Sequence, residues 1–289
     1  MQPDLSTALE RLTGAVVREA KAIGGQHGVG HYRAALADGR MVFVKAAGAG
    51  GAAAAAPALA AEANGLRWLA EAAAVPVPEV LGCADGLLAI SWIAQEKAGR
   101  RSAEAFGRDL ARMHAAGPGR LGAPWPGFIA GLPLGNADGG TWPPWYARER
   151  LLPFARLARD AGQLRAADVR LVETVADRLA ELAGPAEPPS RIHGDCWSGN
   201  VLWSGGRGWL IDPAAHGGHR ETDLAMLALF GAPSLNWVLA AYQEATPLAD
   251  GWQARVPLHQ LHPLLVHVCL FGAAYREAML GAARAALSG

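Results

Sequence analysis

The spacing of apolar side chains along the first part of the chain changes from helical to β-type. An N-terminal helix is predicted by apolar residues at the period of one helix face, namely Leu5, Leu9, Leu12 and Val16. A glycine-rich stretch follows at 23–30, and β-type runs at 32–36 and 41–45 flank an Asp-Gly turn. The pattern predicts a glycine loop within a hairpin whose return strand ends on Lys45.

The next segment predicts a linker, a helix and a further strand. Residues 46–56 form an Ala/Gly-rich linker, and Pro57 is expected to open a helix that carries Glu62 on one side. A strand is predicted over 87–93. The polar, glycine-containing stretch 95–101 that follows is the best candidate for a boundary between two lobes.

Beyond this boundary the apolar spacing is mostly helical. Helices are predicted around 106–113, over 145–162 and 166–183, and again around 224–228 and 261–268. The Pro/Gly/Trp-rich loop at 117–144 is longer than compact domains usually contain without a function, so substrate contacts are expected there. We therefore expect an N-terminal lobe over 1–93 and a larger C-terminal lobe over 94–289.

The candidate chemistry lies between His193 and Asp212. An aspartate, Asp195, is followed five residues later by Asn200 and twelve residues after that by Asp212, with apolar β-like residues between them. In phosphotransferases an aspartate orients or deprotonates the acceptor hydroxyl, while an asparagine and a second aspartate hold Mg²⁺ on the nucleotide phosphates. The spacing therefore predicts Asp195 as the catalytic residue and Asn200 and Asp212 as metal ligands.

The glycine loop and its neighbours add a predicted nucleotide site. Gly24 and Gly25 would let backbone amides approach phosphates, and Lys45 on the adjoining strand would reach them. Glu62 is positioned to pair with Lys45, as a helix glutamate does in kinases. ATP and Mg²⁺ are the expected cofactors. A small lobe with an antiparallel sheet, followed by a larger, mainly helical lobe, is an α+β fold of the two-lobed protein-kinase-like type.

Composition narrows the class of protein. The chain of 289 residues has a formal net charge of zero, so it lacks the electrostatic footprint of a nucleic-acid or acidic-membrane partner. No apolar run approaches the roughly 20 residues of a membrane span, and a cytoplasmic protein, monomeric by default, is expected. The three cysteines are widely spaced and predict neither a disulfide framework nor a zinc knuckle.

These motifs resemble the fructosamine kinase (ketosamine 3-kinase) family, which shares its fold with aminoglycoside and choline phosphotransferases. The resemblance is carried by His-Gly-Asp-Cys-Trp-Ser-Gly-Asn at 193–200, Ile-Asp-Pro-Ala at 211–214, the Gly-His-Arg-Glu-Thr-Asp-Leu-Ala-Met run at 218–226 and Leu-Phe-Gly at 229–231. It implies ATP-dependent phosphorylation of the 3-hydroxyl of a ketosamine, which leads to deglycation. The implied partner is a small ketosamine or a glycated amine or protein lysine.

Several positions depart from the family pattern. Gln26 stands where many members carry a cysteine after the paired glycines, so thiol-based control of the loop is not expected. Ser91 replaces a glutamate at the lobe hinge, which leaves adenine recognition to backbone groups. Val266 stands before the late histidine, where the family often has an asparagine.

Other candidate residues have a structural interpretation, a functional one or both. His193 is expected to brace the catalytic loop, and Asp223 to bond to the backbone of that loop from the start of a helix. Trp197 is either a wall for substrate stacking or a core side chain. Three histidines lie in segments suited to substrate binding, although a buried structural role is the commoner one. They are His216, His219 and His267.

Three other functions fit parts of the sequence. A metal hydrolase is suggested by His193, Asp195, Asp212, His216 and His219, but it leaves the glycine loop, Lys45 and Glu62 without a role. A non-catalytic nucleotide-binding protein usually lacks one of the catalytic side chains, and all of them are present here. A kinase for an aminoglycoside or choline is the alternative within the same class of enzyme.

Overall fold

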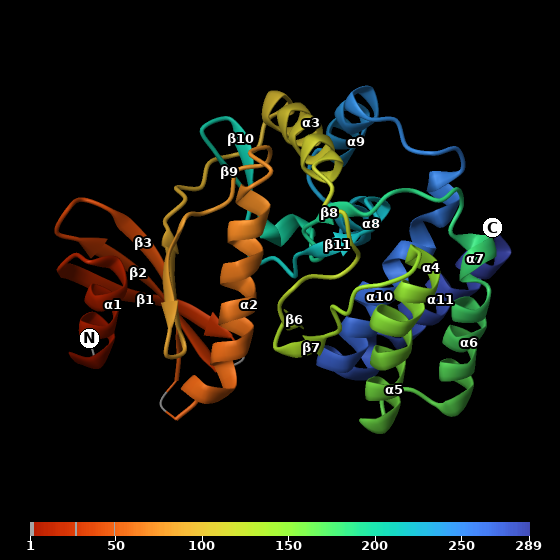
Figure 1. The fold of residues 1–289 in the computed structure, drawn as a ribbon, viewed down its shortest axis with the longest axis horizontal. Coiled ribbons are helices and arrows are strands. Elements are labelled where there is room, and N and C mark those ends of the chain that lie inside the picture. Colours follow the sequence, from red (N-terminus) through yellow and green to blue (C-terminus); the bar gives the residue numbers. More distant parts are fainter. Residues whose placement is uncertain (1–2, 27, 49) are drawn as a thin grey trace.

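The computed structural model describes residues 3–26, 28–48 and 50–289. A small lobe built on an antiparallel sheet stands beside a larger, mainly helical lobe (Figure 1). The expected α+β, two-lobed kinase-like fold is confirmed. The boundary at 93/94 remains a prediction, and it falls in the extended connection between the last strand of the sheet and the next helix.

The sheet of the small lobe lies between two helices. The elements are α1 (Pro3–Thr13), β1 (Val17–Gln26), β2 (Val29–Leu36), β3 (Met41–Ala47), α2 (Ala52–Ala70), β4 (Val80–Ala84) and β5 (Leu87–Ser91), and the strand order is β1-β2-β3-β5-β4. Strand residues alternate between the two faces. Val42 and Val44 pack with Leu9 of α1, whereas Leu88 and Ile90 pack against α2.

Two predicted boundaries in this lobe are wrong. Val16 is 62% exposed and lies beyond α1, which ends at Thr13, just before a glycine with positive φ at position 14. Pro57 does not open its helix, because α2 begins at Ala52 and carries Pro57 inside it. A run of alanines, the strongest helix formers, continues the helix toward the N-terminus, although Pro57 cannot donate a helical hydrogen bond.

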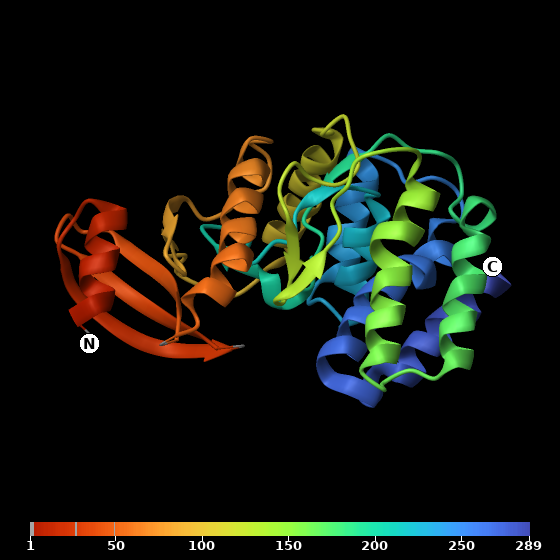
Figure 2. The ribbon, with the colours of Figure 1, turned by 60° about the horizontal axis from the view of Figure 1, so that its bottom comes forward.

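The large lobe begins with a helix, a hairpin and a group of helices. They are α3 (Arg100–Ala115), β6 (Gly127–Ile129), β7 (Leu132–Leu134), α4 (Trp142–Tyr146), the π-helical turn η1 (Ala147–Leu151), α5 (Leu152–Asp160), α6 (Ala166–Asp177) and α7 (Leu179–Leu182). The long loop predicted at 117–144 therefore contains a short hairpin. This hairpin stands between α2 and the helices of the large lobe (Figure 2).

The catalytic segment and the C-terminal helices complete the lobe. The elements are β8 (Ser190–Ile192), the 3₁₀ turn η2 (Ser198–Asn200), β9 (Val201–Ser204), β10 (Arg207–Leu210), β11 (His216–Gly218), α8 (Glu221–Leu229), α9 (Leu235–Ala245), α10 (Trp252–Phe271), the 3₁₀ turn η3 (Gly272–Tyr275) and α11 (Arg276–Ser288). β8 pairs with β11, and β9 pairs with β10. Asp195, Asn200 and Asp212 therefore lie in turns next to these short antiparallel pairs rather than on a large sheet.

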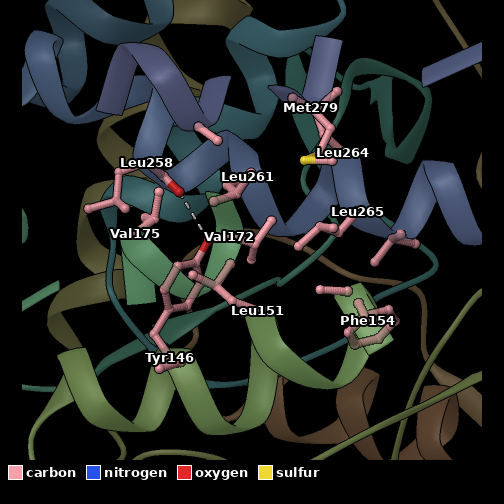
Figure 3. Packing of buried hydrophobic residues seen from close by; sticks show 14 of the residues in the cluster. Tyr146, Leu151, Phe154, Val172, Val175, Leu258, Leu261, Leu264, Leu265 and Met279 are labelled. Carbon is pink, nitrogen blue, oxygen red and sulfur yellow. Dashed lines mark hydrogen bonds between the residues drawn. The ribbon is translucent and has the colours of Figure 1, made fainter. Parts of the chain in front are cut away.

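The core of the large lobe is formed around α10. Leu261 and Leu265 on this helix pack against Leu151 and Val172 from the preceding helices (Figure 3). The Tyr146 hydroxyl donates to the Leu258 carbonyl oxygen at 3.2 Å, which satisfies a buried polar group in this core.

One stretch of the described residues, Trp252–Ser288, is long and apolar enough to cross a membrane by length and composition alone. It consists of α10, η3 and α11, whose buried side chains belong to the core just described. The core helix of a globular protein passes the same test.

Close packing of α3 on α9 gives a first testable prediction. A Cβ on Gly107 would lie 2.2 Å from the Val238 carbonyl oxygen, so Gly107→Ala should lower the free energy of unfolding by about 1–3 kcal/mol through overpacking. Gly281 of α11 has open space around it, and Gly281→Ala should raise that free energy by roughly 0.5–1 kcal/mol. Denaturant unfolding of both variants checks this, and equal effects would contradict the packing argument.

Candidate active site

A cavity of about 620 Å³ opens between the two lobes. The small lobe contributes the glycine loop, β3 and the first half of α2, and the β6–β7 hairpin closes a second side. The catalytic segment and α10 form the remaining wall. Asp195, Asn200, Asp212, Lys45 and Glu62 all line this one cavity, although they come from distant parts of the sequence.

A buried ammonium group joins the lobes at this cavity. Lys45 is 7% exposed, and its Nζ lies 2.8 Å from Glu62 Oε2 and 2.6 Å from Asp212 Oδ1. Burial opposes the charge on Lys45, but the two carboxylates outweigh it and raise the pKa of the lysine. Burial likewise opposes the charge on Asp212, yet the attraction of Lys45 lowers the pKa of this carboxyl.

The sequence around Glu62 and Asp212 explains how they meet. α2 carries Gly65 one turn after Glu62, and a Cβ there would lie 3.2 Å from side-chain atoms of both Pro213 and Ala215. The missing side chain thus lets α2 approach the strand end that holds Asp212. Asp212 itself has a φ of 54°, a left-handed conformation that is uncommon outside glycine and is found at functional sites.

Asp195 and Asn200 form a second unit on the floor of the cavity. The Asn200 amide nitrogen donates to Asp195 Oδ2 at 3.0 Å and to the Asp195 carbonyl oxygen at 2.9 Å. The η2 turn between them brings the two side chains together. Loss of hydration raises the pKa of Asp195 to about 7, with a further contribution from the charge of Asp212.

The Asp223 carboxylate stabilises the loop that carries Asp195. It accepts hydrogen bonds from the backbone nitrogens of His193 at 2.7 Å and Gly194 at 2.9 Å, and from His114 Nε2 at 3.1 Å. His193 Nε2 donates to the Ile211 carbonyl oxygen at 2.9 Å, next to Asp212. Asp223 and His193 therefore connect the segments that carry Asp195 and Asp212.

The glycine loop differs from the prediction in detail. Gln26, Gly28 and Val29 line the cavity, whereas Gly24 and Gly25 do not. Gly25 instead permits a close strand pairing, because a Cβ there would lie 2.7 Å from the Val29 carbonyl oxygen. The paired glycines therefore shape the turn, and the next residues face the cavity. His27, which belongs to the predicted loop, is outside the described residues.

The predicted substrate residues divide into two groups. Trp197 and His267 line the cavity, and Trp197 is 38% exposed with its ring against Gly199. His216 and His219 are buried elsewhere: the His216 ring lies 5.6 Å from that of Trp145, and the His219 ring lies 4.9 Å from that of Trp142. The prediction of substrate contact by His216 and His219 is therefore not supported by their positions.

The arrangement does not gather the residues of the alternative metal hydrolase. His193 hydrogen bonds to Ile211, and His216 Nδ1 donates to the Ala214 carbonyl oxygen at 2.7 Å. A different group of buried side chains, His219, Glu221 and His259, has possible ligand atoms within 4.8 Å of one another. Glu221 is already paired with Arg255 through contacts of 2.9 and 2.5 Å, and this group lies outside the cavity.

Some cavity residues escaped the sequence analysis. The β6–β7 hairpin contributes Phe128 and Leu132, and the end of α10 contributes Phe271. The long Pro/Gly/Trp-rich loop pointed to the hairpin, but no local signal distinguished its cavity-facing residues. Phe271 fits the core-helix pattern equally well, and only its exposure of 55% sets it apart.

A two-lobed fold with a buried lysine–glutamate pair and the spaced residues Asp195, Asn200 and Asp212 beside one cavity is typical of a kinase-like phosphotransferase. A family model described as fructosamine kinase matches residues 1–288. The chain belongs to the fructosamine kinase family, and it is accordingly an ATP-dependent phosphotransferase.

Individual relatives agree with this assignment. The chain is 33% identical to a probable ketoamine kinase of Thermus thermophilus over 76% of its own length and 79% of the relative's. It is 34% identical to a probable ketoamine kinase of Lactiplantibacillus plantarum over 75% of its own length and 78% of the relative's.

Solved structures show the same fold. A "putative fructosamine-3-kinase" from Thermobifida fusca superposes with a TM-score of 0.94 at 52% identity, covering 99% of each chain. The choline kinase LicA of Streptococcus pneumoniae superposes with a TM-score of 0.63 at 17% identity, covering 100% of this chain and 99% of the other. At that identity the likeness concerns the fold alone.

The raised pKa of Asp195 gives a second testable prediction, on stability. Its folded pKa of about 7 lies above the ordinary value of 3.8, so the charged carboxylate destabilises the folded protein at high pH and the cost disappears as the pH falls. Asp195→Asn removes this charge. The stability of the variant relative to the parent protein should therefore be greater at about pH 8 than at about pH 5.

Denaturant unfolding of both proteins at the two pH values measures this difference. Asp160→Asn is a suitable control because Asp160 is an exposed carboxylate paired with its neighbour Arg159. A relative stability of Asp195→Asn that is unchanged between the two pH values would contradict a raised pKa.

Proposed function

We propose that this protein transfers the γ-phosphoryl group of ATP to the 3-hydroxyl group of a ketosamine. One observation carries the proposal: Lys45, Asp195 and Asp212 line a single cavity between the lobes, where a phosphate donor and a sugar hydroxyl could meet. The volume of about 620 Å³ is in the ordinary range for small-molecule sites, roughly 300–1,000 Å³.

The phosphates would bind at the small-lobe side of the cavity. Lys45 supplies a fixed positive charge that is held by Glu62 and Asp212, and phosphate oxygens would compete with these carboxylates for it. Gln26 and Gly28 line the cavity beside it, so their segment is suited to cover the phosphates. The role is that of the kinase lysine, which positions the nucleotide rather than reacting with it.

The metal would be held by Asn200 and Asp212. Both supply oxygen atoms, which suit Mg²⁺ better than Zn²⁺. The side-chain nitrogen of Asn200 donates to Asp195. Its side-chain oxygen accepts no hydrogen bond within the described residues, and it is therefore available as a metal ligand. When bound, Mg²⁺ would neutralise charge on the phosphate oxygens.

Asp195 would act on the acceptor. A sugar hydroxyl is too weak an acid to attack by itself, so the carboxylate would orient it and accept its proton as the oxygen–phosphorus bond forms and ADP leaves. A pKa raised to about 7 makes Asp195 a stronger proton acceptor than an ordinary aspartate, while it is still largely ionised at slightly higher pH. The Asn200 hydrogen bond would keep the carboxylate in place.

Phosphorylation of a ketosamine would destabilise the adduct between sugar and amine, so the biological result would be deglycation. The acceptor would be a free ketosamine or a glycated protein lysine, and the reaction would take place in the cytoplasm. Trp197 and His267, which line the cavity on the acceptor side, would contact it.

A screen of acceptors tests the proposed function. ADP release measured with a coupled assay should depend on ketosamines, such as fructosamines, ribulosamines or erythrulosamines, and should stay at the background rate with aminoglycosides or choline. Phosphate on the 3-hydroxyl should be visible in the NMR spectrum of the product. Turnover with aminoglycosides alone would contradict the proposal.

A further prediction concerns the role of Asp195 in catalysis. Asp195→Asn should lower ketosamine phosphorylation by about 10²–10⁴, the usual contribution of a positioned acid or base. Its affinity for ATP should change little, because the nucleotide would be held by Lys45 and the metal ligands. Steady-state kinetics with a nucleotide titration separate the two effects, and Asp160→Asn again serves as the control. Near-parental phosphorylation by Asp195→Asn would remove it from the mechanism.

A further inference from the structure

Five aromatic side chains of the large lobe form a continuous row, which we call the aromatic wall. It consists of Trp197, Phe230, His267, Phe271 and Tyr275. Ring centroids are 6.1 Å apart between Trp197 and Phe230, and 4.9 Å apart between Phe230 and His267. From His267 they are 5.4 Å to Phe271 and 4.8 Å to Tyr275.

The aromatic wall is partly exposed, although three of its members are large apolar side chains. Trp197 is 38% exposed, Phe230 37% and Phe271 55%. A contiguous exposed aromatic patch marks a binding surface more often than single exposed residues do. Trp197, His267 and Phe271 also line the cavity, so the patch continues directly into the candidate active site.

The position of the aromatic wall relates it to the acceptor. Trp197 follows two residues after Asp195, and its backbone nitrogen donates to the Asp195 carbonyl oxygen at 3.0 Å. The other members come from the C-terminal ends of α8 and α10 and from η3. The fold therefore gathers aromatic rings from distant segments of the large lobe beside the cavity, whereas Lys45 belongs to the small lobe.

The cavity contains few carboxylates that could bind a positively charged acceptor. Among the described residues that line it, the carboxylates are Glu62, Asp195 and Asp212. Each already has a partner in Lys45 or Asn200. Near His267 the cavity is otherwise lined by apolar side chains such as Val266 and Leu270. An acceptor with several ammonium groups would find no unpaired carboxylate there.

His267 does not add a positive charge to the wall at neutral pH. Burial lowers the pKa of this histidine, and its Nδ1 donates to the Pro263 carbonyl oxygen at 2.7 Å, which orients the neutral ring. A neutral imidazole beside Phe230 and Phe271 keeps the surface aromatic and uncharged.

We propose that the aromatic wall binds the amine-derived half of the ketosamine and selects adducts of aromatic or apolar amines with a single positive charge. The proposal rests on the proposed function. The secondary ammonium of the adduct would lie against ring faces, which attract cations, and the substituent beyond it would pack along Phe271. A second ammonium would lose hydration without gaining a carboxylate partner, so it would be disfavoured.

The test compares three ketosamines that carry the same 1-deoxyfructose group on the nitrogen of benzylamine, propylamine or ethylenediamine. The parent protein should phosphorylate the benzylamine adduct with a kcat/KM about tenfold above that of the ethylenediamine adduct. Phe271→Ala should lower kcat/KM for the benzylamine adduct by about fivefold and that for the propylamine adduct by only about twofold, because a propyl group offers less surface to pack on the ring. Phe271→Leu, which keeps the apolar bulk, provides a second variant without the ring.

Trp237→Ala is the matched control, because Trp237 is a 41% exposed aromatic residue on α9 that contacts Arg100 and does not line the cavity. Parent turnover of the ethylenediamine adduct at or above that of the benzylamine adduct would overturn the inference and leave the proposed function intact. So would equal effects of Phe271→Ala and Trp237→Ala on the benzylamine adduct. If no ketosamine were phosphorylated, the proposed function would fail, and the inference with it.

Discussion

The arrangement of the site depends on one buried cation. Removing the Lys45 ammonium from water is costly, and the cost is offset by two carboxylates from different parts of the chain, Glu62 at 2.8 Å and Asp212 at 2.6 Å. This requirement draws α2 toward the large lobe, and the small size of Gly65 permits the approach. The left-handed conformation of Asp212 is tolerated within the same contact. The lobes are therefore joined at the point where phosphates would bind.

A second buried charge organises the acceptor side. The Asp223 carboxylate is fully enclosed, and hydrogen bonds from two backbone amides and from His114 stabilise it. These bonds also lower the pKa of Asp223 despite its burial, so it remains charged, whereas burial raises the pKa of Asp195. Asp223 on α8 and Asp195 on the neighbouring loop thus take different states: Asp223 is suited to support the loop, and Asp195 to accept a proton.

The disagreements between sequence and structure have a common cause. Helix spacing suggested that Val16 belongs to α1, and the proline rule suggested that Pro57 opens α2, because both rules consider only neighbours in the chain. His216 and His219 lie in the predicted segment but are buried against Trp145 and Trp142, outside the cavity. The segment 216–219 is too short to show a periodic hydrophobic pattern, so the sequence does not indicate which way these side chains point.

The sequence by itself determined the fold class and the chemical set of Asp195, Asn200, Asp212, Lys45 and Glu62, because spacing along a short hairpin and residue type are local properties. The tertiary structure decided which side chains meet: Lys45 and Asp212 are 167 residues apart in the chain. It also decided that Phe230 and Phe271 remain exposed beside the cavity, although their apolar character alone predicts burial. Exposure depends on what packs against a residue, and that follows only from the arrangement of all the helices.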